Sequence, residues 1–186
     1  MKEPTFIGLD LSLTRTGMCA ITGTAIEFYT LSPKPAGIYG APRLDWLIKE
    51  IDAVATQHGN IHAVAIEGYS FNSQNQAHKM GELGGLVRWW FYKLRIPTLL
   101  VSPKTMQKFV TGRGDNPNPK EVVRECIRET WGVFTNNEDE SDAGGCAMVA
   151  QAWRTRPDDL EKYQIDALKK IEVLPMRAPR QRRRRR

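Results

Sequence analysis

The sequence predicts an α/β domain with a mixed five-stranded sheet, in which three antiparallel strands are followed by two parallel ones, and with helices on both faces. The order of the patterns is the first reason. Three closely spaced runs rich in Ile, Phe, Tyr and Thr come first, and helical and strand-like segments alternate after them. The second reason is that two apolar runs each end in an acid, Asp10 and Glu67. An unpaired buried charge is expensive, so these acids indicate that the two strand ends serve a function.

The first half of the chain predicts the centre of this sheet. A meander of antiparallel strands is expected over residues 5–13, 18–22 and 25–31. A helix is expected from Pro42 to Gly59, because apolar residues recur there at helical spacing and proline suits a first turn. The next strand, 63–69, is almost continuously apolar, which is typical of a strand covered on both faces. The crossover helix makes the first and fourth strands parallel neighbours and sets Asp10 beside Glu67.

The second half predicts mostly helices. In order, we expect a helix over 74–94, a strand over 98–102, helices over 103–110 and 119–131, and a last core helix that opens at residues 136–143. Asn118 and Glu121 form a capping-box pattern around the first turn of the 119–131 helix. The last core helix carries Asp139 and Asp142, which share a face because they are three residues apart. The charged segment 158–173 is expected to form an outlying helix.

We expect the last core helix to bring Asp139 and Asp142 to the strand ends that carry Asp10 and Glu67. Four carboxylates in one place repel one another unless divalent cations lie between them. Hard oxygen ligands select Mg²⁺, for which Mn²⁺ can substitute, over zinc. Two such ions about 4 Å apart can hold the attacking and leaving oxygens of a phosphodiester. The alternative for Asp10 alone is an aspartate that caps its own turn through its side chain.

The charge of the chain is concentrated at one end. The formal net charge is +6, yet the last seven residues contain six arginines, and the remainder has 21 basic and 21 acidic residues. A terminal block of like charge is typically disordered, and a basic block often binds nucleic acid, here through Arg182, Arg183 and Arg184. A solubility or cloning feature is the alternative. We therefore expect a main folded domain over 1–156, a helical extension over 157–179 and a disordered tail over 180–186.

Several classes of protein are excluded by composition. No apolar run approaches the length of a bilayer span, and the first residues lead almost directly into a strand, unlike a signal peptide. The three cysteines are scattered and odd in number, which fits a reducing cytoplasm and neither a disulfide framework nor a zinc cluster. We expect no small-molecule cofactor and no membrane partner.

Four short motifs follow one another between residues 5 and 153: Gly8-x-Asp10 with Thr16-Gly17, then Ile66-Glu67 with a Gly-rich helix over 79–85, then Gly112-x-Gly114 with Lys120, and last Asp139-x-x-Asp142-Ala143. This ordered set resembles the RuvC-type Holliday junction resolvases, in a phage-like variant. The resemblance implies an RNase H-like fold and a homodimer that cuts four-way DNA junctions symmetrically with Mg²⁺. It also implies that Asp10, Glu67, Asp139 and Asp142 are the catalytic metal ligands. A phage protein of this kind would act in the bacterial host cytoplasm, in DNA recombination and repair.

Residues that contact DNA are expected around these acids. Basic side chains flank the loop ahead of the last core helix and could bind phosphates, and these are Lys104, Lys108, Arg113 and Lys120. A solvated helix face is the alternative for them. The resolvase family often places an aromatic residue three positions after the strand-end glutamate, where this chain has Ser70. Phe71 is the candidate for stacking on an unpaired base, with plain packing as the alternative.

Three other functions compete with a junction resolvase. A nuclease of the same fold that cuts RNA–DNA hybrid or structured RNA would use the same four acids. A sugar-kinase or actin-like ATPase is suggested by the pattern Asp10-x-Ser12-x-Thr14, but that fold needs two such domains and 186 residues are too few. A catalytically inactive DNA-binding module would tolerate loss of the acids, all of which are present. We therefore expect a Mg²⁺-dependent, structure-selective DNA endonuclease.

Overall fold

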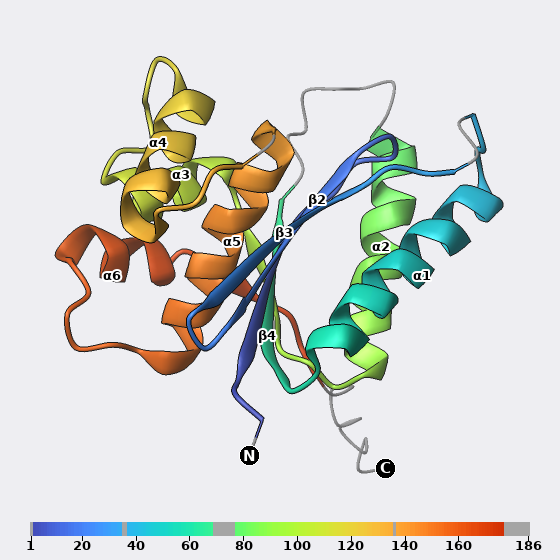
Figure 1. Cartoon of the computed structure of the whole chain (residues 1–186), viewed down its shortest axis with the longest axis horizontal. Helices are drawn as coiled ribbons and strands as arrows, with labels where there is room; N and C mark the ends of the chain where they lie inside the picture. Colours follow the sequence, from blue (N-terminus) through green and yellow to red (C-terminus); the bar gives the residue numbers. More distant parts are fainter. Residues whose placement is uncertain (1, 35–36, 69–76, 136, 177–186) are drawn as a thin grey trace, which may run out of the picture.

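The computed structural model describes residues 2–34, 37–68, 77–135 and 137–176 (Figure 1). Four residues that the sequence assigns to DNA binding lie outside this part of the chain, namely Phe71, Arg182, Arg183 and Arg184. The disordered tail predicted over 180–186 lies outside it as well.

A mixed sheet forms the centre of the molecule, in the strand order β3-β2-β1-β4-β5-β6. β1 runs antiparallel to β2 and parallel to β4, so the predicted central position of the first strand is confirmed. Asp10, the last residue of β1, pairs with Gly17 at the start of β2, and Leu9 pairs with Ile66 of β4. The strands are β1 (Thr5–Asp10), β2 (Thr16–Thr22), β3 (Ala25–Leu31), β4 (Ile61–Glu67), β5 (Thr98–Val101) and β6 (Glu172–Val173).

The C-terminal segment differs from its prediction. The expected helix over 158–173 is wrong: the helix there is the shorter α6 (Lys162–Leu168), and β6 follows it and pairs antiparallel with β5. The sheet therefore has six strands where five were expected. Leu100 of β5 pairs with Glu172, and α6 packs on α3 (Pro103–Thr111), so the segment is joined to the sheet and to a core helix. Pairing with the edge of β5 places residues 172–173 in a strand, where a helix was expected.

Helices cover both faces of the sheet (Figure 1). On one face, α1 (Ala41–His58) and α2 (Ala77–Lys93) pack over alternate residues of the central strands, among them Ile7, Leu9, Val64 and Ile66. On the other face, α5 (Glu138–Thr155) lies against β1, β2 and β4, and α3 and α4 (Pro119–Trp131) pack outside it. Two separate cores result, as expected of parallel strands that are buried on both sides.

Two glycines allow α5 to lie directly on the sheet. A methyl group added at Gly8 of β1 would lie 1.9 Å from the carbonyl oxygen of Ala143 and 2.3 Å from the amide nitrogen of Ala147. One added at Gly17 of β2 would lie 2.0 Å from the carbonyl oxygen of Asp139. Backbone atoms cannot move out of the way cheaply, so only glycine fits at these two positions. The N-terminal half of α5 is thereby fixed over the ends of β1 and β2.

The helix ends follow the sequence signals in part. Ser102 caps α3, because its hydroxyl accepts a hydrogen bond from the Thr105 amide at 3.2 Å. Asn137 caps α5 in the same way through the Glu140 amide at 3.0 Å. The capping box expected around Asn118 is wrong, since the Asn118 side chain makes no capping hydrogen bond to α4. Among the residues that the structure describes, no helix is long and apolar enough to cross a bilayer.

Candidate metal centre

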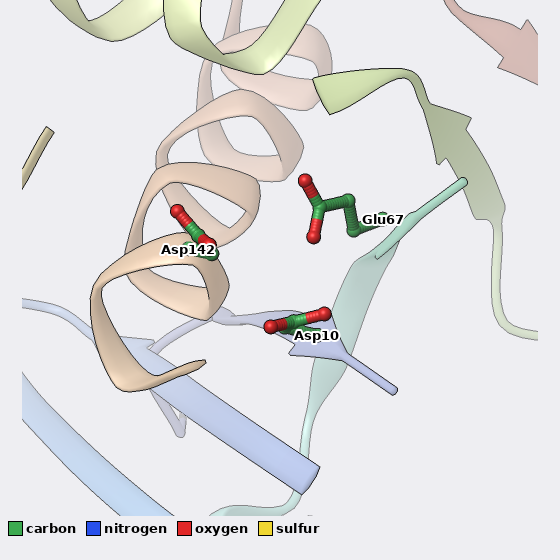
Figure 2. A group of neighbouring side chains, drawn as sticks. All are labelled: Asp10, Glu67 and Asp142. Carbon is green, nitrogen blue, oxygen red and sulfur yellow. The ribbon is translucent and has the colours of Figure 1, made fainter. Parts of the chain in front are cut away.

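Three carboxylates meet where β1, β4 and α5 come together. Asp10, Glu67 and Asp142 each offer an oxygen within 4.8 Å of the others, and their side chains point toward one another (Figure 2). Asp10 and Glu67 end neighbouring parallel strands, as the sequence predicts. Asp142 lies in the second turn of α5 and is buried. All donors are carboxylate oxygens, the ligands that Mg²⁺ and Mn²⁺ prefer, so the residues fit a hard divalent cation.

The electrostatics of this carboxylate cluster favour a positive partner. Burial raises the pKa of Asp10 to about 6 despite an opposing hydrogen bond with Glu67, and the charge of Asp139 adds to the rise. Burial raises the pKa of Glu67 to about 10, helped by the charges of Asp10 and Asp142. Burial and the charge of Asp10 raise the pKa of Asp142 to about 7. Without a cation the cluster therefore retains protons near neutral pH, which a divalent ion would displace.

Asp139, the fourth predicted ligand, lies beside the cluster and not within it. Its carboxylate forms an ion pair with Arg15, whose Nε donates to Oδ2 of Asp139. Arg15 belongs to the loop between β1 and β2. The Asp139 charge still reaches the cluster, because it raises the pKa of both Asp10 and Asp142. The sequence thus places Asp139 on the correct helix face, but its side chain is turned to a different partner.

Lys120, one of the predicted DNA-binding residues, lies close enough to the acids for its charge to act on them. Its Nζ donates to Oε2 of Glu138 at 2.7 Å, and this hydrogen bond is the main cause of the raised pKa of Lys120. Its positive charge lowers the pKa of all three cluster residues, which are Asp10, Glu67 and Asp142. Lys120 therefore lies beside the site and is held there by Glu138.

The other predicted basic residues of the described part of the chain have different neighbours. Lys108 lies near Asp166 of α6, whose pKa is lowered mainly by a hydrogen bond with Lys169 and to a smaller extent by the charge of Lys108. Arg113 is exposed and its Nε lies 3.4 Å from Oδ1 of Asp115. Lys104 is exposed in the first turn of α3. The contact of these three side chains with phosphate stays a prediction.

Three features of the site were not predicted from the sequence, namely Arg15, Glu138 and the hydrogen bonds that hold the start of α5. Thr30 of β3 donates to Oε1 of Glu140 at 2.6 Å, and Asn137 donates to Oγ1 of Thr30 at 2.9 Å. These bonds join the start of α5 to β3. The sequence held one signal that Arg15 belongs to the site. Arg15 lies between Asp10 and the Thr16-Gly17 pair, which puts a cation close to a predicted ligand.

Comparison with protein-family models finds no match, and comparison with curated protein sequences finds none either. Comparison with solved structures does find similar folds. One is Thermus thermophilus RuvC in complex with a Holliday junction substrate, with 20% identity, a TM-score of 0.68, and coverage of 77% of this chain and 90% of the other. A second Thermus thermophilus RuvC structure has 21% identity and a TM-score of 0.64, with coverage of 77% and 91%. The chain therefore has the RNase H-like fold of RuvC, as its motifs predicted.

Proposed function

We propose that this chain is a Mg²⁺-dependent endonuclease that resolves four-way or branched DNA junctions. One observation carries the proposal: Asp10, Glu67 and Asp142 converge within 4.8 Å on a fold shared with RuvC, of which one solved structure contains a Holliday junction. Partly or fully buried acids with raised pKa values where three elements meet are typical of a functional site.

The cluster residues would hold two ions, with Asp10 as a ligand to both and Glu67, Asp142 and Asp139 as the remaining ligands. When bound, the ions would supply activation of the attacking water and charge stabilisation of the leaving 3′-oxygen. The chain itself positions the carboxylates through the strand ends and the close packing of α5. Lys120, held by Glu138, would bind a phosphate next to the cut, because it combines an exposed ammonium group with a fixed location.

Junction selectivity would come from the basic surface and from a second copy of the chain. Lys104, Lys108 and Arg113 would bind the arms of the junction, together with Phe71 and the C-terminal arginines Arg182, Arg183 and Arg184. A homodimer would present two clusters to the two strands that must be cut, and so would make symmetric nicks. We propose recombination and repair in a bacterial cytoplasm, with a phage as the source, as the setting of this activity.

The test is a cleavage assay with labelled substrates in Mg²⁺. It compares a four-way DNA junction, a linear duplex of the same sequence and an RNA–DNA hybrid, with wild-type protein and Asp10→Asn. Paired symmetric nicks in the junction alone, lost in Asp10→Asn, are the expected result. Cutting confined to the hybrid would instead establish the ribonuclease alternative, and binding without any cutting would establish the inactive DNA-binding module.

A further inference from the structure

We infer that Arg15 is a positioning residue that keeps Asp139 out of the carboxylate cluster until DNA arrives. The inference deepens the proposed function and rests on it. It concerns the order of events at the site: the cluster of Asp10, Glu67 and Asp142 takes the first ion, and a second ion requires Asp139, which Arg15 must first release.

The position of Asp139 allows its side chain to turn while its backbone stays fixed. The carbonyl of Asp139 packs over Gly17, where even a methyl group would collide with it at 2.0 Å. Its side chain is 17% exposed, whereas that of Arg15 is 51% exposed. The ion pair therefore lies at the surface of the site, and both side chains can rearrange without disturbing the core.

Asp139 lies close enough to the cluster to join it. It stands one turn before Asp142 on the same face of α5, and its backbone packs on Gly17, the residue that pairs with Asp10 in the sheet. Its carboxylate is not among the three whose oxygens converge within 4.8 Å. Since one carboxylate oxygen is already held by Arg15, a cation and the guanidinium compete for the same group.

This competition links ion binding to DNA binding. A guanidinium released from Asp139 would find its best new partner in a phosphate, which it can bind with two parallel hydrogen bonds. A phosphate that binds Arg15 frees Asp139, so DNA favours the second ion, and by reciprocity the second ion favours DNA. The arrangement delays completion of the metal site until a phosphodiester lies beside it.

The test measures Mn²⁺ binding to the full chain without DNA. Calorimetry and electron paramagnetic resonance give the affinity and number of bound ions for the wild type and Arg15→Gln, with Arg15→Lys and Lys120→Gln as matched variants. The Lys120 variant removes a different positive charge, one that acts on all three cluster residues, so it reports the general effect of charge. In Arg15→Gln we expect the affinity for the second ion to rise about fivefold relative to the affinity for the first. This factor corresponds to the free energy of one half-exposed ion pair.

Arg15→Lys, which can still pair with Asp139, is expected to behave like the wild type. In Lys120→Gln we expect both ions to gain affinity by the same factor. Equal gains for both ions in Arg15→Gln, or an unchanged or weaker second ion, would overturn the inference. Failure of the metal site itself is distinguishable, because in that case Asp10→Asn would leave Mn²⁺ binding unchanged. Failure of the proposed substrate would appear separately, in the cleavage assay on junction, duplex and hybrid.

Discussion

Replacing Asp142 by asparagine should stabilise the metal-free protein, although the replaced residue is buried. Burial and the charge of Asp10 raise the pKa of Asp142 from 3.8 to about 7 in the folded chain. Between these two pH values the folded state binds more protons than the unfolded state, so the free energy of unfolding falls as pH rises. Asparagine has no charge to bury and does not suffer this loss.

The size of the expected gain in stability follows from the rise in the pKa of Asp142. One pKa unit is equivalent to about 1.4 kcal/mol, so the rise from 3.8 to about 7 costs the wild type about 4 kcal/mol once Asp142 is ionised. For a chain of this size each kcal/mol changes Tm by roughly 2–4 °C. At pH 8 without metal, the Asp142→Asn variant should therefore melt up to roughly 8–16 °C above the wild type.

The assay is thermal unfolding at pH 4 and pH 8 in metal-free buffer, and again at pH 8 with Mg²⁺. We expect the gain at pH 8 to vanish at pH 4, where Asp142 is protonated in the folded protein. Mg²⁺ should raise Tm in the wild type and much less in the variant, because the ion loses a ligand. Asp45→Asn on α1 is the control, since Asp45 is exposed and pairs with Lys49, and its loss should change stability little. An Asp142→Asn variant that is destabilised equally at both pH values would refute the electrostatic reasoning.

Three further outcomes follow from the same geometry. Asp10→Asn should abolish cutting in Mg²⁺ while junction binding by gel shift survives; cutting at near the wild-type rate would remove Asp10 from the site. Gly8→Ala should destabilise the protein by at least about 3 kcal/mol in urea unfolding, because the new methyl group would collide with the Ala143 carbonyl. Gly81→Ala is the control: this position has open space around it, so the change should be neutral or stabilise the protein by up to about 1 kcal/mol. Lys120→Ala should weaken junction binding at every sequence and reduce the slope of log affinity against log salt by about 1, measured by fluorescence anisotropy; an unchanged slope would mean that Lys120 does not contact phosphate.

The centre of the fold could be predicted because local pattern and topology agree there. The apolar runs that end in Asp10 and Glu67 form neighbouring parallel strands, and the three-residue spacing places Asp139 and Asp142 on one face of α5. The right-handed crossover between β1 and β4 leaves few other ways to arrange these strands. For this reason three of the four predicted acids come together as expected.

The parts that could not be predicted depend on partners far away in the sequence. Arg15 and Asp139 are 124 residues apart, and no local pattern shows that they meet. β6 has two residues and exists because β5 offers it an edge, so its sequence alone carries too little strand preference. Likewise Asn118 has the right residue type for a cap, but its side chain makes no capping bond in the folded chain.

The close packing of α5 explains why the acids keep protons instead of moving apart. The helix is held by the backbone contacts at Gly8 and Gly17, and its start is tied to β3 through Thr30. A helix on a less crowded surface could shift outward and let Asp142 reach water, which would lower its pKa. Here the repulsion cannot be relieved by movement, so it is relieved by protonation or by a bound cation. The same two glycines that let α5 lie on the sheet therefore also keep Asp142 beside Asp10 and Glu67.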